Sequence, residues 1–288
     1  SKIINSRVKS LEVLAHNIKT HHFPVKYLVT ASAIGIYANS VTQYYDEKQS
    51  QFSSNSFLSS VVHKWEAAVG AFDTSDLKIC ILRIGIVLDT NDGALPKIMF
   101  PIKNYFGAAL GNGNQWQSWI HIDDLAEIFL HVIKNNLTGI INAVAPNPVT
   151  QNQLIKSLGR NLNRPLILPN IPKFLVKLIL GDRSQLVLSS QKISSRKIEA
   201  SGFNFKFRDF ENAIKHIDKG YIVMDDYHMP TKTDKDIEVA NFIDTLPESV
   251  TRKLVKTDRV LFRDDLKRSL KDLDYGMVLF PIGVIENE

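Results

Sequence analysis

The spacing of apolar residues in the first part of the chain changes from a helical to a strand-like period. Residues 6–18 place an apolar side chain at every third or fourth position: Val8, Leu11, Leu14, Ala15 and Ile18. This spacing predicts an amphipathic helix. Residues 25–30 form a short apolar run typical of a buried strand, so residues 31–37 are expected to form the loop at its carboxyl end.

The same alternation continues further along the chain. Residues 57–72 again show helical spacing, with one apolar face: Leu58, Val61, Val62, Trp65, Val69 and Phe72. Residues 78–88 are a second apolar run, and a helix joining two such strands predicts a parallel β-α-β unit with a right-handed crossover. A helix over 123–134 and a strand over 140–144 extend this pattern, which predicts an α/β fold with a doubly wound, Rossmann-like parallel sheet.

Beyond Pro146 the pattern changes to helices separated by prolines. Helical spacing is found at 151–162, 171–180 and, more weakly, 191–200. Residues 201–209 alternate aromatic and polar side chains and are expected to form a short edge segment, followed by a last helix at 210–217. We therefore predict an incomplete Rossmann-like domain over 1–145 and a small helical cap over 146–217.

Residues 218–288 contain no motif that we can relate to a known family. Helical spacing with mixed charge occurs at 234–243, 248–255 and 263–273, which suits either a helical tail or a partly ordered one. This segment carries 11 Lys/Arg and 15 Asp/Glu, a net charge of −4, which leaves about +9 for residues 1–217. The acidic tail could therefore engage a protein partner or the basic body.

Composition excludes several classes of protein. The chain has 288 residues, 44% of them hydrophobic, so it can bury a large core. It has no apolar run of the roughly 20 residues that span a bilayer and no signal-peptide segment, so we expect no membrane association and a cytoplasmic location. Cys80 lies alone in an apolar run and is expected to be a core residue. The basic residues form no block with aromatics, and no zinc spacing is present, which argues against nucleic-acid binding and a metal site.

Three segments carry a family resemblance. They are Trp116–Ala126, with the sequence WQSWIHIDDLA, Asn142–Thr150, with the sequence NAVAPNPVT, and Ala31–Tyr37, with the sequence ASAIGIY. Together they resemble the epimerase-like (NAD-dependent epimerase/dehydratase) branch of the extended short-chain dehydrogenase/reductases, in the subfamily that has a C-terminal domain of unknown function. The resemblance covers about residues 1–217 and implies NADP or NAD as cofactor and a small metabolite as substrate.

The resemblance also implies a Ser-Tyr-Lys catalytic set, which this sequence does not preserve. On the helix expected over 57–72, the Tyr and Lys positions fall on Leu58 and Val62, and neither side chain can move a proton. The serine position falls on Ala33, next to Ser32. The weak candidates left for proton transfer are Ser32, Tyr37 and His121, with Tyr44 and Tyr45 weaker still, so whether the chain is an enzyme stays open.

Other site residues follow from the resemblance. Ala31, Ser32, Tyr37, Arg83 and Gly85 are expected beside the cofactor, with Gly85 permitting close backbone approach. Trp119 and His121 are expected beside the substrate. Four of these residues have a structural alternative. The alternatives are a Ser32 hydroxyl bonded to its own loop, a Tyr37 ring packed under the sheet, an Arg83 side chain at the surface and a structural His121. Asp123 and Asp124 are expected to cap the helix that they begin, rather than bind metal or transfer protons.

The glycine-rich loop that binds the pyrophosphate of a dinucleotide does not occur in these 288 residues. No Gly-x-x-Gly-x-x-Gly is present, and the glycine-rich turn at 110–116 lacks the ending of a phosphate loop. By the resemblance, roughly 80 to 100 residues with the first strands of the sheet precede Ser1 in relatives. We expect a truncated NAD(P)-dependent epimerase/dehydratase-like protein that binds dinucleotide poorly in isolation. The alternative is a non-catalytic interaction module that uses the acidic tail.

Overall fold

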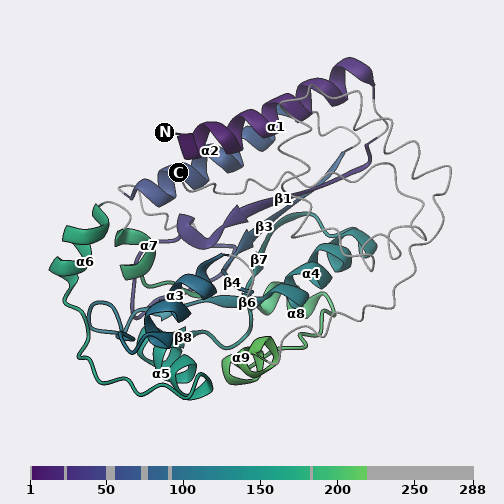
Figure 1. Cartoon of the computed structure of the whole chain (residues 1–288). Helices are drawn as coiled ribbons and strands as arrows, with labels where there is room; N and C mark the ends of the chain where they lie inside the picture. Colours follow the sequence, from purple (N-terminus) through teal and green to yellow (C-terminus); the bar gives the residue numbers. More distant parts are fainter. Residues whose placement is uncertain are drawn as a thin grey trace, which may run out of the picture. The chain divides into compact units, whose positions relative to one another are not determined.

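The structure is a computed structural model of the chain, and it describes residues 2–22, 25–49, 56–72, 77–89, 93–181 and 184–218 (Figure 1). All of these residues belong to one compact unit. The acidic tail expected over 218–288, apart from its first residue, lies outside the described residues, and so do its three expected helical segments. None of the described helices has both the length and the apolar character needed to cross a bilayer.

A three-stranded parallel sheet forms the centre of this unit. Its strand order is β1-β3-β7, from β1 (Tyr27–Ala33), β3 (Lys78–Ile84) and β7 (Gly139–Ala143). Figure 1 shows α1 (Lys2–His21) and α2 (Phe57–Ala68) together on one side of these strands and α4 (Ile122–Lys134) on the other. The expected α/β fold with a parallel sheet is confirmed.

The apolar stripes read from the sequence explain why the helices lie where they do. Leu11 and Ala15 of α1 pack with Trp65 of α2 against Leu28 of β1, in a buried cluster. Burying aliphatic or aromatic side chains of this size contributes about 1.5–3 kcal/mol each. The α2 helix starts at Ser56, whose hydroxyl accepts the Ser59 N–H, and it ends in a short 3-10 turn, η2 (Val69–Ala71).

The strand expected over residues 78–88 is interrupted at Gly85. The Gly85 N–H donates to Ala143 O of β7 over 3.2 Å, whereas the Ile86 N–H donates to Ser118 O over 2.9 Å. The chain therefore leaves the central sheet and continues as β4 (Ile86–Leu88), which pairs in parallel with β6 (Trp119–His121). The prediction of one continuous strand was wrong because Gly85 allows the chain to change partners.

A second core contains residues from both expected domains, such as Leu88, Trp119 and Leu158. α5 (Gln151–Asn161) begins at Thr150 with a capping box and packs against α9 (Phe210–Asp218). α3 (Ala94–Lys103) joins the same cluster. The sequence analysis did not predict α3, because prolines inside and near the start of this segment, Pro96 and Pro101, conceal its helical spacing.

The remaining elements are short. β2 (Tyr44–Tyr45) pairs with β9 (Lys192–Ile193), and β5 (Trp116–Gln117) pairs with β8 (Val149–Thr150). The helices are α6 (Lys173–Leu180), α7 (Ser184–Leu188), α8 (Arg196–Ala200) and the 3-10 turn η1 (Ile34–Ile36). Of the helix expected over 191–200, only α8 is helical, since residues 192–193 pair with β2.

The edge segment expected over residues 201–209 does not form a strand. Burial does alternate along it, since Phe203 and Phe205 are buried and meet edge to face, whereas Asn204 and Lys206 are exposed. The backbone N–H groups of Lys206 and Phe207 donate to the two carboxylate oxygens of Asp124, over 2.8 and 2.9 Å. A buried carboxylate thus takes the place of a strand partner for this segment.

Candidate functional site

Three polar side chains lie side by side at the carboxyl ends of the central strands. In the parallel registers, Ser32 of β1 is opposite Arg83 of β3, and Arg83 is opposite Asn142 of β7. All three residues are buried. The carboxyl edge of a parallel sheet is where ligands bind in α/β folds, so this row is the natural starting point for a site.

Glu66 of α2 joins two of these side chains. The Ser32 hydroxyl donates to Glu66 Oε1 over 2.6 Å. Arg83 donates from Nε to Oε1 over 2.9 Å and from Nη2 to Oε2 over 2.8 Å. Burial would lower the pKa of Arg83, but the hydrogen bonds and charges of Glu66 and Tyr37 outweigh it and raise the pKa, so the guanidinium stays charged. Glu66 thereby fixes α2 to the strand ends.

Tyr37 completes the network from the end of the loop after β1. Its hydroxyl accepts from Arg83 Nη1 over 3.0 Å and donates to Asn142 Oδ1 over 2.8 Å. Its ring lies under the Arg83 guanidinium, 5.1 Å from the centroid, and stacks on Tyr45. Burial raises the pKa of Tyr37 above its ordinary value, although Arg83 acts in the opposite direction. Burial thus favours the protonated phenol, which donates to Asn142 in this network.

Leu58 and Val62 occupy the positions where the Tyr-x-x-x-Lys pair would lie. A Cβ placed on Gly35 of η1 would be 3.5 Å from the Leu58 Cβ and 3.9 Å from Val62 Cγ2. Both side chains thus face the strand-end loop, and Val62 packs with Ile34 and Ile36. Both side chains are apolar, and neither can donate or accept a proton.

The groups that reach the surface at this edge are small and apolar. Ala33, Gly35 and Ala38 on the loop, and Gly85 after β3, are partly exposed. The polar side chains of Ser32 and Arg83 lie behind them and are directed to partners within the protein. We call Ala33, Gly35 and Gly85 the apolar wall of this edge. Beside it lie the partly exposed carboxylates of Glu66 and of Glu47, and Glu47 accepts the Asn142 N–H over 2.8 Å.

The predicted cofactor residues lie close together in the structure, but the surroundings of three of them differ from the expectation. Arg83 is not a surface side chain, since only 1% of its area is exposed. Ala31 is buried in the cluster with α1 and α2. Gly85 does permit a close backbone approach, but the approaching group is Ser118 O, which would be 2.5 Å from a Cβ at this position. The role of Ser32, Tyr37, Arg83 and Gly85 toward a cofactor stays a prediction.

Trp119 and His121 do not line a cleft, contrary to expectation. Trp119 is fully buried, contacts Phe210 edge to face and donates its indole N–H to Asn147 O over 2.9 Å. His121 is also fully buried and caps α4 by accepting the Asp123 N–H at Nδ1 over 3.1 Å. The strand β6 that carries them pairs with β4, and all three of its residues are buried. Neither is placed to contact a substrate.

The prediction that Asp123 and Asp124 cap α4 is wrong in part. His121, not an aspartate, is the N-cap. Asp124 is fully buried and accepts from the backbone of residues 206–207 rather than from its own helix. Burial raises the pKa of Asp124, which those two backbone hydrogen bonds partly oppose.

Sequence reasoning missed Glu66 and Asn142 as site residues. Asn142 interrupts the apolar run 140–144, and a polar side chain on a strand otherwise predicted to be buried was a usable signal. Its side chain also donates to Ser194 O over 3.3 Å. Glu66 gave no such signal, because a glutamate next to Trp65 on an amphipathic helix is equally typical of a solvated face.

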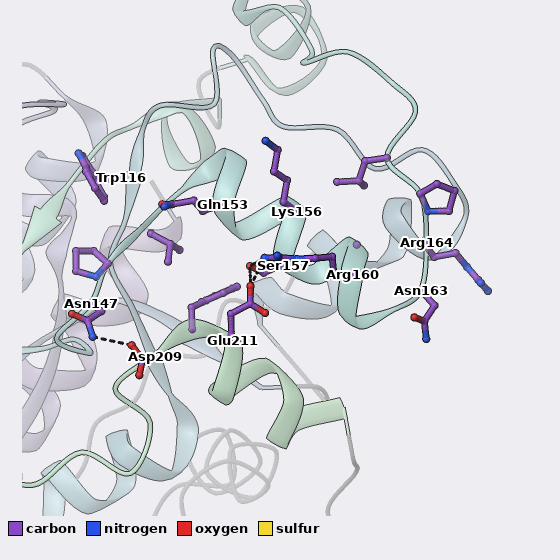
Figure 2. A pocket seen from close by; sticks show the side chains of 16 residues that line it. Trp116, Asn147, Gln153, Lys156, Ser157, Arg160, Asn163, Arg164, Asp209 and Glu211 are labelled. Atoms are coloured by element: carbon purple, nitrogen blue, oxygen red, sulfur yellow. Dashed lines mark hydrogen bonds and ion pairs between the residues drawn. The ribbon is translucent and has the colours of Figure 1, made fainter.

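A second candidate is a surface hollow of about 920 Å³ between α5, α9 and β8 (Figure 2). Figure 2 shows Glu211 directed toward Ser157 and Arg160, and Asn147 beside Asp209. Ser157 donates to Glu211 over 2.6 Å, and Arg160 pairs with the same carboxylate. None of the network residues lines this hollow. Arg164, which also lines the hollow, lies over the Tyr105 ring.

The described residues fit only part of a dinucleotide. The wall at Ala33, Gly35 and Gly85 suits one face of a nicotinamide ring. A pyrophosphate needs a row of backbone N–H groups at a helix N-terminus after a glycine loop. At the end of β1 the chain forms only the three-residue turn η1, so the described strand-end loop does not supply that cradle.

Comparisons with known proteins give consistent matches. The family model of a domain of unknown function (DUF1731) matches residues 171–217. The chain is 33% identical over 216 residues to the epimerase family protein YfhF of Bacillus subtilis strain 168, covering 75% of this chain and 70% of that protein. It is 35% identical over 213 residues to the epimerase family protein SAR0825 of Staphylococcus aureus strain MRSA252, covering 74% and 70%.

Solved structures agree with these matches. The human epimerase family protein SDR39U1 (isoform 2), solved with NADPH, has a TM-score of 0.71 at 30% identity and covers 75% of this chain and 73% of that chain. A nucleoside-diphosphate sugar epimerase from Corynebacterium glutamicum has a TM-score of 0.60 at 23% identity, covering 94% and 49%, which shows likeness of fold alone.

Proposed function

The chain belongs to the epimerase family, and from this premise we propose that it supplies the nicotinamide side and the cap of an NAD(P)-binding, epimerase-like protein. In a longer form, this protein would bind NADP(H) or NAD(H) together with a small metabolite. The NADPH bound to the human relative favours NADP(H) as the cofactor. The Ser-Tyr-Lys relay is degenerate in this chain.

The apolar wall at the carboxyl edge of the sheet carries the proposal. Leu58 and Val62 face the strand-end loop, where a proton relay would require Tyr and Lys. The nearest hydroxyls, on Ser32 and Tyr37, are held by Glu66, Arg83 and Asn142. A ligand at this wall would meet a surface suited to stacking and burial. Because these two hydroxyls are committed to partners within the protein, binding of a ligand, and not proton exchange through Ser32 or Tyr37, is the function that this arrangement supports best.

The described residues would hold only the nicotinamide end of the cofactor. A nicotinamide supplies hydride transfer when bound. Ala33, Gly35 and Gly85 would contact one face of the ring and exclude water from it. The network behind them keeps the strand ends in register, so that the wall is rigid before a ligand arrives.

The two halves of the cofactor test this assignment. We would titrate the full 288-residue chain with reduced nicotinamide mononucleotide and, separately, with AMP, and follow backbone amide shifts by NMR. We expect the nicotinamide half to move the amides of Ala33, Gly35 and Gly85 at millimolar concentration, and AMP to leave them unchanged. Equal shifts with AMP, or no shift with the nicotinamide half, would contradict the proposed wall.

A second measurement tests the weak-binding part of the proposal. Calorimetry of the same chain with NADPH should show no binding in the micromolar range, since the pyrophosphate cradle is not formed at the described strand-end loop. Micromolar binding would overturn that part. Turnover of carbonyl compounds or sugar nucleotides with NADPH would overturn the assignment of a degenerate relay.

A further inference from the structure

Two histidines and a carboxylate meet where α9 passes the start of α4. They are His121, Asp123 and His216, and one potential ligand atom from each lies within 4.8 Å of the other two. His121 Nδ1 and Asp123 Oδ2 are 3.7 Å apart. Among the residues that the structure describes, no other group of three His, Cys, Asp or Glu side chains meets this spacing.

The distances suit a shared metal ion. Ligand atoms bound at about 2.1 Å to a tetrahedral zinc ion lie roughly 3.4 Å from one another. The His121–Asp123 pair is already within a few tenths of an ångström of that separation. His216 lies near the end of α9 and is exposed, so a change of its rotamer can bring its ring closer. Closing the site around an ion therefore requires a movement of His216 and the release of His121 Nδ1 from the Asp123 N–H.

The surroundings favour a fixed, partly dry site. Phe207 stacks on the His121 ring at 3.9 Å between centroids and lies 4.7 Å from the His216 ring. His121 is fully buried, whereas Asp123 is half-buried and His216 is exposed. The site therefore has an apolar wall and an open side. An ion could enter from solvent at His216 and keep a water molecule as a further ligand.

Two features limit the affinity of these three residues for a metal ion. The Asp123 N–H donates to His121 Nδ1, so an ion at that nitrogen would replace the N-cap hydrogen bond of α4. The positive end of the α4 dipole also faces a cation, although the charge of Asp123 opposes it. Three protein ligands with these costs are typical of a micromolar site and not of a structural zinc centre.

We propose that His121, Asp123 and His216 form a binding site for a divalent transition-metal ion, with Zn²⁺ as the ion that this ligand set fits best. The bound ion ties α9 to the beginning of α4 at the edge of the second core. This site shares no residue with the network around Arg83, and it does not depend on dinucleotide binding. The spacing in the sequence, with His121 two residues from Asp123 and His216 far away, conceals it from a motif search.

Metal titration of the full chain tests the site. We would add Co²⁺ and follow its visible absorption, then displace it with Zn²⁺ and measure Zn²⁺ binding by calorimetry. We expect one ion per chain and a visible band typical of a low coordination number. Two variants on accessible side chains, His216→Gln and Asp123→Asn, should each weaken Zn²⁺ binding roughly tenfold or more.

A matched control separates this site from general histidine binding. His16→Gln removes an exposed histidine on α1 and should leave both the affinity and the stoichiometry unchanged. Circular dichroism would verify that each variant is folded. The proposal is overturned if the wild-type chain binds no Zn²⁺, or if His216→Gln and Asp123→Asn, both folded, bind it as the wild type does.

Discussion

Arg83 and Glu66 join the middle strand of the sheet to α2 through a two-point ion pair, with Nε–Oε1 and Nη2–Oε2 distances of 2.9 and 2.8 Å. Their side chains are only 2% and 13% exposed. Both charges have lost most of their hydration, and the paired geometry offsets that loss. The pair therefore locks the register between α2 and the strand ends, which is where a cofactor wall must be rigid.

Glu66→Gln should destabilise the protein strongly. Glutamine keeps the shape but removes the charge, so the buried Arg83 guanidinium loses its counter-ion. Breaking a buried ion pair in this way costs about 3–5 kcal/mol. Urea unfolding followed by tryptophan fluorescence would measure the change. Glu12→Gln, an exposed carboxylate on α1, is the control and should change stability by less than about 0.5 kcal/mol.

The double variant Glu66→Leu with Arg83→Met completes this test. It removes both charges and replaces them with apolar side chains of similar length, so most of the stability lost in Glu66→Gln should return. If the single variant costs less than about 1 kcal/mol, solvent reaches the pair and it does not lock α2.

Cys80 should be inert toward thiol reagents in the native protein. It is fully buried in β3, and burial raises the pKa of its thiol to about 12. The thiolate is the reactive form, so labelling with an aromatic disulfide at neutral pH should proceed only through unfolding. The labelling rate should rise in step with the unfolded fraction as urea is added. Rapid labelling of the whole sample without urea would contradict this.

Because the pKa of this thiol is raised, we expect the free energy of unfolding to fall at alkaline pH. Between the ordinary pKa of 9.0 and the folded value of about 12, the unfolded chain loses this proton while the native chain keeps it. The contribution of Cys80 is therefore fully present below pH 9 and falls by about 1.4 kcal/mol per pH unit above it. Tyrosines and lysines also titrate there, so the measurement is the difference between wild type and Cys80→Ala. If the stability of the wild type and of Cys80→Ala changed in parallel with pH, the raised pKa of Cys80 would be refuted.

The sequence predicted most of the layered fold but not its short elements. Periodic apolar residues marked α1, α2 and α4 because each buries one stripe, such as Leu11 with Ala15, against the sheet. The chain switch at Gly85 was not visible, since apolar residues continue on both sides of it. The α3 helix was concealed by its prolines, and β2 and β9 are too short to show a period.

The sequence indicated where in the fold the candidate site lies, but not which side chains hydrogen-bond to one another there. The carboxyl edge of the sheet and Ser32, Tyr37 and Arg83 followed from the segments resembling the epimerase family. Their partners depend on register, which places Arg83 level with both Ser32 and Asn142, and register is a property of the folded sheet. His121 was expected beside the substrate because the matching run borders the active cleft in the family, whereas all three residues of β6 are buried here.

Gly85→Ala should weaken the junction between the central sheet and β4. A Cβ at this position would lie 2.5 Å from Ser118 O and 2.9 Å from Val144 Cγ1, and the nearer atom is backbone. The strands must separate, which costs about 1–3 kcal/mol as overpacking does elsewhere. Gly70→Ala is the matched control, because nothing lies within 4 Å of a Cβ there. Equal thermal stability of the two variants would show that the junction can relax.

Asp124→Asn should release the segment that connects α8 to α9. The carboxylate accepts two backbone N–H groups, from Lys206 and Phe207, whereas an asparagine offers one acceptor oxygen and sets its own N–H₂ against the other donor. Leaving one buried donor unsatisfied costs about 1–3 kcal/mol. Hydrogen exchange would locate the effect, with faster exchange expected at the amides of residues 206–207 and 210–218 and unchanged exchange in β1 and β3. Uniform acceleration throughout the chain would instead show that Asp124 supports the whole fold rather than this connection.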